Sequence, residues 1–346
     1  MKTYKISEGR YLATDGEHVY EVAAPPKKIN KLKRFILISE KYYKSVKALS
    51  DIGIKTDYAD PEKLEYIIEN SVIKVDDKEY KFEVSKKDVG NTVVFIKSGY
   101  SKPELAYLYE EFMNLGILVI NNPEAVANTS NKWITYELLV KNDIVTPHSV
   151  LITSNDVSKK DNSGMEKKLK EIYKNPKDDD KYVCKLLKGH GGRGVFICRH
   201  KNILSILQCI FAVKKDTQIL VQKFIDIKGG DIRANILTIK GKQQFINAVV
   251  RTKDGAKDFR TNLSLGGHAE DAVLNTKQKR LALNAAKVSG LTWAGVDIIE
   301  DTDGNNYVIE INGAPGTPFD VEDKDELLKK NTEFYNKLAN MISEML

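Results

Sequence analysis

A glycine-rich segment is the sharpest chemical feature of this sequence. In YVCKLLKGHGGRGVFIC, a strand-like run that carries Lys185 leads into glycines that include Gly191, Gly192 and Gly194. Glycines let a backbone approach phosphate oxygens closely and direct its N–H groups at them, and a nearby lysine adds a compact positive charge. No Walker GK[ST] follows, and the glycines do not open a helix as in a dinucleotide fingerprint. The segment is therefore either a phosphate cradle between two strands or a plain flexible hairpin.

Two C-terminal strands supply oxygen ligands. In AGVDIIEDTDGNNYVIEINGAPG, the turn DTDGNN joins two apolar runs, with Asp297 on the first and Glu310 and Asn312 on the second. Alternation puts Glu310 and Asn312 on one face of their strand, and pairing across the turn can bring Asp297 beside them. Two carboxylates and one amide suit Mg²⁺, which prefers oxygen ligands and often bridges nucleotide phosphates. A polar stripe that faces solvent is the alternative.

A third segment places charged and polar side chains among apolar neighbours. These residues are Asp231, Arg233, Arg251, Arg260 and Asn262. The planar fork of an arginine can hold phosphate or carboxylate oxygens in two-point contact. Because Arg260 and Asn262 alternate onto one face of an extended chain, together they could grip a transferring phosphoryl group. Structural ion pairs, for example between Asp231 and Arg233, are the alternative.

The elements that must position these residues fall into four predicted parts. Residues 1–30 form an extension with a short hairpin that turns at Asp15-Gly16, and residues 31–120 form a small α/β domain. Residues 121–215 form a central domain, and residues 216–346 form a C-terminal domain that holds the oxygen ligands. The site is thus expected in the last two thirds of the chain.

Apolar periodicity predicts the individual elements. In the small domain, strands are expected over RFILIS, TVVFIK and ILVI, helices over EKYYKSVKALSDIG, PEKLEYIIEN and PELAYLYEEFMNLG, and a hairpin around Asp76-Asp77. Beyond Asn121, the pattern predicts a helix from Ser130 to Asn142, an extended entry into a strand at Pro147, and a helix over MEKKLKEIY.

Composition and charge exclude several classes of protein. The 346 residues carry a net charge of +6 from lysines scattered among carboxylates, without the arginine clusters and interleaved aromatics of a nucleic-acid surface. Apolar runs have only strand length and the N-terminus lacks a signal-peptide pattern, so we expect a cytoplasmic protein that does not bind membranes. The three cysteines, Cys184, Cys198 and Cys209, form no CxxC pair and are expected to be reduced core thiols.

The order of these segments, over roughly Asn121 to Pro318, resembles the ATP-grasp superfamily, and more specifically its RimK-like carboxylate-amine ligases. NNPEAVANTSNKWITYELLVKNDIVTPHS is similar to the stretch that opens the ATP-grasp module, which makes Lys132 the first phosphate-contacting lysine and Lys185 the second. GHGGRGV looks like the lid loop of the family. The resemblance implies an α/β (α+β) ATP-grasp fold, with the nucleotide held between two α+β subdomains that follow a small α/β N-terminal domain.

The resemblance also implies a role for each site residue. Asp297, Glu310 and Asn312 would coordinate Mg²⁺ or Mn²⁺, and Lys132 and Lys185 would hold the α and β phosphates of ATP. The candidate catalytic residues are Arg260 and Asn262, which would face the γ-phosphate, together with Arg233 and Arg251. Asp231 would lie near the ribose.

The hinge strand departs from the family pattern. LVQKFI, with Gln222, Lys223 and Phe224, resembles the strand that lines adenine, but Lys223 stands where an acidic residue is common. Backbone groups of Lys223 and Phe224 would then have to recognise the adenine. We assign no role to His190 or His268, because a loop histidine is more often a solvated or phosphate-adjacent donor than a general base.

The function implied by the resemblance is an ADP-forming ligase that makes an amide through an acylphosphate. Its partners would be a small-molecule, peptide or protein carboxylate and an amine donor, and family precedent allows a homo-oligomer. A peptide-modifying ligase that closes side-chain amide or ester links is an alternative. From another class comes a regulatory module that binds ATP without catalysis, but simple binding would not demand the full phosphoryl-transfer set of residues.

Overall fold

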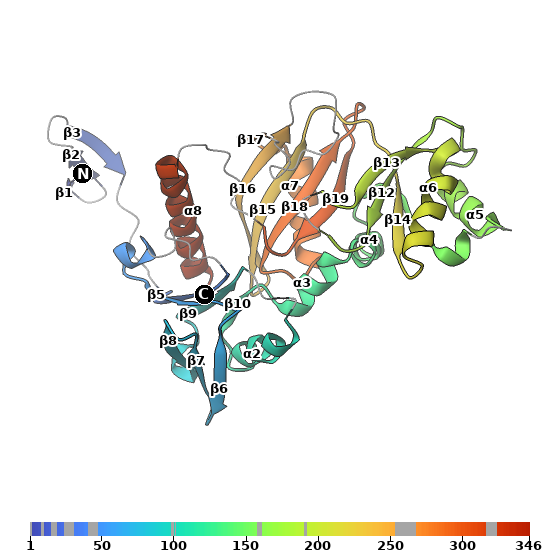
Figure 1. Ribbon diagram of the computed structural model, residues 1–346. Coiled ribbons are helices and arrows are strands. Elements are labelled where there is room, and N and C mark those ends of the chain that lie inside the picture. The colour runs from blue at the N-terminus through green and yellow to red at the C-terminus, as the bar shows by residue number, and fades with distance from the viewer. Residues whose placement is uncertain are drawn as a thin grey trace.

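The computed structural model in Figure 1 contains five separate sheets among the residues that it describes. The described residues are 2–7, 10–14, 19–23, 31–40, 48–97, 100, 102–157, 161–189, 192–252, 268–315 and 324–346. Within them, no helix combines the length and the apolar character that crossing a bilayer demands. The predicted boundaries at residues 120 and 215 stay predictions.

The N-terminal extension forms an antiparallel sheet of β1 (Lys2–Ser7), β2 (Arg10–Thr14) and β3 (Val19–Ala23). Thr14 pairs with Val19, so the predicted hairpin between β2 and β3 is confirmed, and its turn lies outside the described residues. The strand β1 was not expected from the sequence.

The small α/β domain is built on the parallel sheet β10-β9-β4-β5. Its strands are β4 (Arg34–Ile38), β5 (Lys55–Ala59), β9 (Thr92–Ile96) and β10 (Leu118–Ile120), and α2 (Pro103–Asn114) covers one face. The strands predicted over RFILIS, TVVFIK and ILVI and the helix over PELAYLYEEFMNLG are confirmed. Of the helix predicted over EKYYKSVKALSDIG, the first part lies outside the described residues, and η1 (Ala48–Ile52) is a 3₁₀ helix.

The helix predicted over PEKLEYIIEN is wrong, because this segment contains the strand β6 (Glu65–Glu69). Asn70 and Ser71 both have positive φ angles, 52° and 61°, and form a two-residue turn into β7 (Val72–Asp76). Positive φ at both turn positions is the type I′ geometry that favours asparagine and closes a β-hairpin. The turn and the adjacent isoleucines favour strands, and this preference exceeds that of the weak helical spacing for a helix. A second hairpin leads from β7 to β8 (Lys81–Ser85) and confirms the turn predicted around Asp76-Asp77.

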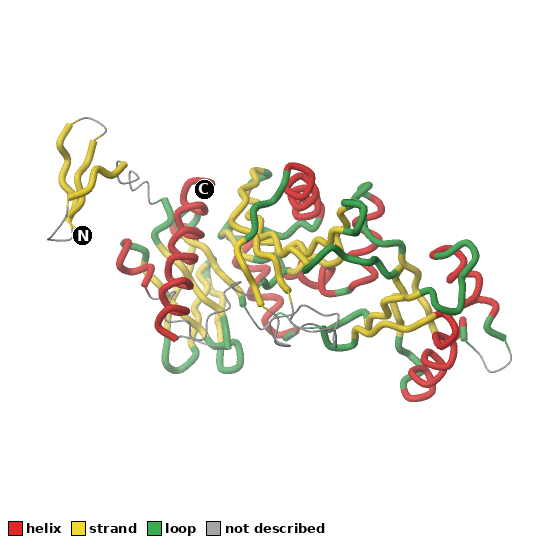
Figure 2. Tube along the Cα trace, turned by 90° about the horizontal axis from the view of Figure 1, so that it is seen from above, coloured by secondary structure: helices red, strands yellow, loops and turns green. Residues whose placement is uncertain are grey.

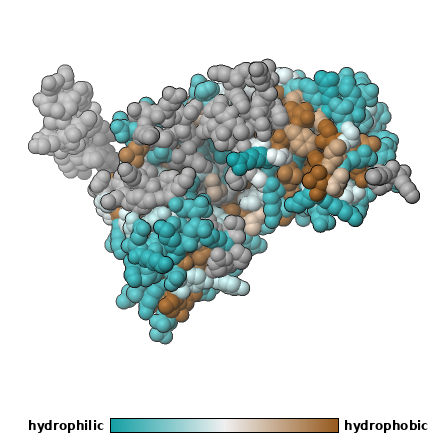
Figure 3. Space-filling model, viewed as in Figure 1, coloured by the Kyte–Doolittle hydropathy of each residue, from teal (hydrophilic) through white to brown (hydrophobic). Residues whose placement is uncertain are grey.

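A further sheet has the order β11-β14-β12-β13 and carries two helices on one face. We call this sheet and its helices the lid. Its elements are β11 (Ser149–Thr153), β12 (Lys181–Leu186), β13 (Val195–Arg199), β14 (Gln218–Lys223), α5 (Ser163–Ile172) and α6 (His200–Val213). Tyr182 and Cys184 pack under the helices, so alternation turns Val183 and Lys185 to the opposite, open face. Figure 3 shows apolar side chains gathered over this part of the molecule.

The cysteine prediction holds for two of the three thiols. Cys184 and Cys198 are buried, with their sulfur atoms 3.4 Å apart across β12 and β13. Cys209 is exposed, so its assignment to the core is wrong. The reason is its position on α6, whose buried face is formed by Ile203, Leu207 and Phe211.

The C-terminal sheet has the order β17-β16-β15-β18-β19. Its strands are β15 (Asp231–Ile239), β16 (Lys242–Thr252), β17 (His268–Asp271), β18 (Trp293–Glu300) and β19 (Asn306–Asn312). The helix α7 (Thr276–Val288) packs its alanines against Val296 and Val308 on one face. Two short helices, α3 (Pro123–Ser130) and α4 (Lys132–Lys141), lead from the small domain to the lid, where the sequence predicted one helix from Ser130 to Asn142.

The last helix, α8 (Lys324–Met345), returns to the small domain. Phe334 and Tyr335 pack against Phe95 of the parallel sheet and against Trp293 of the C-terminal sheet. Figures 1 and 2 show this helix beside both sheets. The face of the C-terminal sheet that carries Trp293 therefore packs against α8 at one end. The other end of this face carries Asp297 and is available for a site.

Candidate functional site

The three predicted metal ligands lie together on β18 and β19. Asp297 pairs directly with Glu310 across the two antiparallel strands, and Gly295 pairs with Asn312. The side-chain amide of Asn312 lies 3.4 Å from a carboxylate oxygen of Asp297. The structure thus brings the two carboxylates and the amide to one place, as alternation and the turn at DTDGNN predicted.

Two arginines form ion pairs with the carboxylate of Asp297. Arg233, directly opposite on β15, donates to both oxygens, with Nη2 2.8 Å from Oδ2. The Nη2 of Arg251 lies 3.0 Å from the same Oδ2. Burial by itself raises the pKa of Asp297, but the positive charges of Arg233 and Arg251 more than offset this effect and lower the pKa below its ordinary value. Asp297 is therefore a fixed anion.

Arg251 joins Asp297 to a second buried carboxylate, Asp231. Asp231 and Arg251 pair across β15 and β16, and their side chains form an ion pair. Burial opposes the charge on Arg251, but the two carboxylates raise its pKa above the ordinary value. The structural ion pairs considered from the sequence are present, with different partners from the expected Asp231 and Arg233. Because Asp231 is only 4% exposed, a ribose contact by this carboxylate stays a prediction that the geometry does not support.

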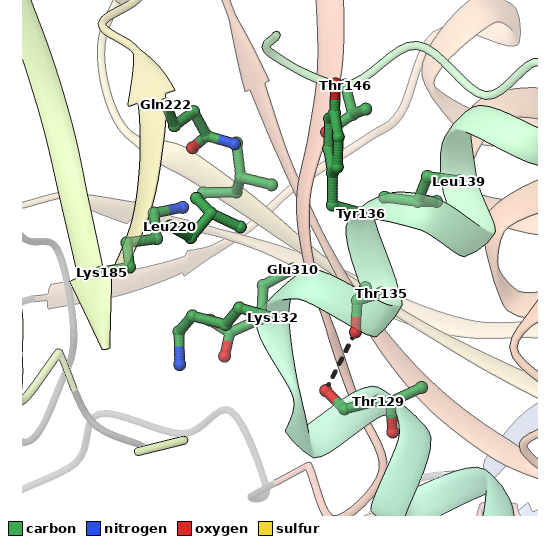
Figure 4. Close-up of a pocket in the computed structure, with 11 residues that line it drawn as sticks. Thr129, Lys132, Thr135, Tyr136, Leu139, Thr146, Lys185, Leu220, Gln222 and Glu310 are labelled. Atoms are coloured by element: carbon green, nitrogen blue, oxygen red, sulfur yellow. Dashed lines mark hydrogen bonds between the residues drawn. The ribbon is translucent and has the colours of Figure 1, made fainter. Parts of the chain in front are cut away.

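The predicted phosphate-binding residues line a hollow between the lid and β19 (Figure 4). Lys185 of the lid, Lys132 at the start of α4 and Glu310 all line it. Burial lowers the pKa of Lys185 to about 8, and the neighbouring charge of Lys132 acts in the same direction, whereas Glu310 and Asp297 oppose the shift. A buried lysine of this kind gains most when a phosphate supplies the missing negative charge.

The glycine-rich segment forms the turn between β12 and β13, beside the two lysines. Gly194 has a φ angle of +73°, and a Cβ there would lie 2.6 Å from Cδ1 of Leu186, so only glycine fits. The Nζ of Lys132 donates to the carbonyl of Gly189 at 3.0 Å. Gly192 also has a positive φ, 73°, whereas Gly191 lies outside the described residues. The described glycines of the segment that connects β12 to β13 therefore adopt backbone angles that favour glycine.

The hinge strand contributes Gln222 to the hollow and turns Lys223 away from it. The Nε2 of Gln222 is buried and donates to the Oγ of Ser149 at 3.0 Å. The ammonium of Lys223 lies 5.7 Å from the ring centre of Tyr173. The backbone N–H groups of Lys223 and Phe224 donate to carbonyls of the protein, so the predicted adenine contacts depend on their carbonyl oxygens.

Some predicted residues cannot be placed, and other residues at the hollow were not predicted. Arg260, Asn262 and His190 lie outside the described residues, so their roles stay predictions. The hollow is also lined by residues that the sequence did not single out: Thr129, Thr135, Tyr136, Leu139, Thr146, Leu220 and Ile309. All seven are neutral side chains, most of them on α3, α4 or neighbouring strands, and no charge or spacing marks them in the sequence.

The donor set of Asp297, Glu310 and Asn312 fits a hard divalent cation by its chemistry, because all three side chains offer oxygen. In the described part of the chain, no cluster of three or more His, Cys, Asp or Glu side chains competes with it as a metal site. Since both oxygens of Asp297 are bonded to arginines, a cation must share this carboxylate with a guanidinium or displace one.

Comparison with known protein families and sequences gives a consistent result. Residues 129–330 match the family model described as a RimK-like ATP-grasp domain. A probable alpha-L-glutamate ligase from Vibrio atlanticus is 30% identical over 208 residues, which cover 60% of this chain and 62% of that protein. A probable alpha-L-glutamate ligase from Psychromonas ingrahamii is 33% identical over the same shares. The match thus spans less than two thirds of the length of these relatives.

Solved structures share the fold over most of the chain. A RiPP-associated ATP-grasp ligase from Chryseobacterium gregarium, in complex with ADP and a leader and core peptide, has a TM-score of 0.64 at 12% identity and covers 91% of this chain and 98% of its own. D-alanyl-alanine synthetase A from Vibrio cholerae has a TM-score of 0.57 at 15% identity, with coverages of 90% and 99%. These likenesses show the ATP-grasp fold and confirm the predicted fold class.

Proposed function

Because the chain belongs to the RimK-like ATP-grasp family, we propose that it is an ATP-dependent ligase that joins a carboxylate to an amine and releases ADP. The observation that carries this proposal is the position of Glu310. Its carboxylate belongs to the predicted metal triad with Asp297 and also lines the hollow that holds Lys132 and Lys185. Oxygen ligands for a cation and ammonium groups for phosphates therefore share one site.

The reaction needs ATP because a carboxylate is a poor electrophile whose leaving group would be oxide. Transfer of the γ-phosphoryl group to the substrate carboxylate gives an acylphosphate, from which an amine can displace phosphate. A bound Mg²⁺ or Mn²⁺ would bridge and partly neutralise the phosphate oxygens. Asp297, Glu310 and Asn312 would hold the ion, and Lys132 and Lys185 would hold the phosphates.

The arginines next to the triad suit the developing charge of this reaction. Arg233 and Arg251 lie on the same face of the sheet as Asp297 and bond to its carboxylate. Pre-oriented donors stabilise negative charge without further reorganisation, and their effect is larger where water is excluded. Closure of the lid would exclude water from the acylphosphate. Arg260 and Asn262 would complete the γ-phosphate contacts.

The names of the curated relatives favour glutamate as the amine donor. The product would then be an amino acid, peptide or protein whose mass has increased by one or more glutamate residues. Intact-mass measurement of the product tests this part of the proposal. A product that has lost one water from a single peptide would instead indicate a ligase that joins two groups of the same peptide.

The test of the ligase function is Glu310→Ala, measured by ADP release from Mg-ATP with glutamate and acidic peptides. We expect turnover to fall at least about 100-fold, because a ligand of the phosphoryl-transfer site is lost. Glu270→Gln is the matched control, because Glu270 is an exposed carboxylate on the edge strand β17 of the same sheet. Undiminished ADP release in Glu310→Ala would refute the metal assignment. Absence of substrate-dependent ADP release in the wild type would refute the ligase function.

A further inference from the structure

Lys97 is a half-buried lysine at the carboxyl end of β9, in the middle of the parallel sheet. Its Nζ donates to the carbonyl of Pro315 at 2.8 Å and lies 5.2 Å from the ring centre of Trp293 and 5.5 Å from that of Phe95. No carboxylate among the described residues forms an ion pair with it. An ammonium group has three N–H donors, so two remain after the bond to Pro315.

This cation differs from the arginines of the neighbouring sheet. Arg233 and Arg251 are each neutralised by aspartates. Burial without such a partner lowers the pKa of Lys97 to about 8. Buried charges are ordinarily paired, and one carbonyl with two aromatic faces replaces only part of the lost hydration. Among the described residues, the preference of this ammonium for an anion is therefore unmet.

Lys97 lies beside the face of β18 that carries Asp297. Trp293, Gly295 and Asp297 alternate onto this one face. Pro315 covers Gly295 so closely that a Cβ there would lie 2.9 Å from the Cβ of Pro315 and 3.1 Å from Cδ of Arg233. Lys97, bonded to Pro315 and set over Trp293, is thus a cation of the small domain that lies beside the site.

The contacts of Lys97 place it close to Asp297. Its Nζ is bonded to Pro315, and Pro315 packs on Gly295, which lies two residues, or about 7 Å of strand, before Asp297. A substrate carboxylate bound by Lys97 would therefore lie beside the site.

Given the proposed ligase function, we propose that the ammonium of Lys97 binds a carboxylate of the substrate. The enzyme would then select an amino acid or peptide that carries such a carboxylate, and the small domain would take part in substrate selection. The recognised group is a carboxylate of an acidic amino acid or peptide, not a phosphate of the nucleotide.

The test compares Lys97→Met with the wild type, with L-glutamate, L-glutamine and L-isoglutamine as probes. The two amides remove the side-chain and the α-carboxylate of glutamate in turn. Binding is measured by calorimetry with Mg-ADP present, and KM and kcat are measured by ADP release. We expect glutamate to bind about 10- to 100-fold more weakly to Lys97→Met, as for the loss of a charged hydrogen bond. One amide should bind equally to both proteins, and the affinity for Mg-ADP should not change.

Two further variants separate charge from structure. Lys97→Arg keeps the charge and should recover much of the affinity for glutamate. Lys102→Met is the matched control, because Lys102 follows in the same loop but is bonded to Glu62 at 2.7 Å and to the carbonyl of Pro61. It should bind glutamate as the wild type does.

The outcomes are distinct for the two proposals. Equal glutamate affinity in Lys97→Met and wild type, no glutamate binding by the wild type, or an equal loss in Lys102→Met would each overturn the role of Lys97. Glutamate binding that depends on Lys97 without any ADP release would support this role and refute the ligase function. A melting temperature close to that of the wild type shows that Lys97→Met is folded.

Discussion

The guanidinium of Arg233 bonds to both carboxylate oxygens of Asp297, its direct partner across β15 and β18. Asp297 is also bonded to Arg251, so the central predicted metal ligand is an anion whose charge is already balanced inside the protein. A metal nucleotide and the arginines therefore compete for the same oxygens. The arrival of the phosphates would give the arginines a second anion to bind, which would free Asp297 for the cation.

Asp297→Asn tests this arrangement. The change leaves two buried arginines short of a counter-charge, so we expect the free energy of unfolding to fall by about 3 kcal/mol. Mg-ADP affinity should fall at least about 10-fold, because the amide is a weaker ligand than the carboxylate. Urea denaturation and calorimetry measure the two effects. Asp303→Asn, in the exposed turn of the same hairpin, should leave both unchanged.

Lys185→Met tests the phosphate ligands of the lid. Because Lys185 lines the hollow without an ion-pair partner among the described residues, its loss should weaken ATP binding by about 10- to 100-fold. Stability should change little or increase, since a desolvated ammonium is removed. Lys170→Met, on the exposed face of α5, is the control. An unchanged nucleotide affinity in Lys185→Met would contradict the placement of phosphates at this hollow.

Asn121→Ala tests how the small domain is joined to the site. The side chain of Asn121 is buried, donates to the carbonyls of Trp293 and Gly313, and accepts from the N–H of Trp293 at 2.7 Å. Removing it leaves several buried backbone groups unpaired, so we expect a loss of about 3 kcal/mol of unfolding free energy. Asn114→Ala, exposed at the end of α2, should cost less than about 0.5 kcal/mol. Equal stabilities of the two variants would contradict this role.

The pH dependence of stability tests the environment of Lys97. Its pKa is about 8 in the folded protein and near 10.5 when unfolded, so between these values the unfolded chain binds the extra proton. The unfolding free energy of the wild type should therefore rise relative to that of Lys97→Met as the pH increases from 8 towards 10.5, by up to about 3 kcal/mol. Denaturation at several pH values measures the difference. A constant difference across this window would show that Lys97 is not desolvated.

Local patterns in the sequence predict the pairing of the two carboxylates well, whereas their role as metal ligands stays a prediction. Asp297 and Glu310 belong to two strands joined by a short turn, so alternation and turn position suffice to bring them together. The lysine of β12 and its glycine turn are likewise local. Where the turn signal was misread, as at Asn70-Ser71, a strand was predicted as a helix.

Longer-range pairings could not be predicted in the same way. Arg233 meets Asp297, and Asp231 meets Arg251, because of the registers of β15 with β18 and with β16. Nothing in the local sequence specifies the first register, since it joins segments 64 positions apart. Lys97 shows the same limit: a lone lysine after a buried strand has no distinctive spacing, and its neighbours Trp293 and Pro315 come from a distant part of the chain.

The helix α8 has a consequence for the order of folding. The backbone N–H of Lys31 donates to the hydroxyl of Ser343, a contact between residues 312 positions apart, and Phe95 packs against Tyr335. During synthesis the parallel sheet is therefore made long before the helix that completes its core. Contacts of such separation slow folding, and the apolar face of Phe35, Leu37 and Phe95 stays uncovered until α8 emerges.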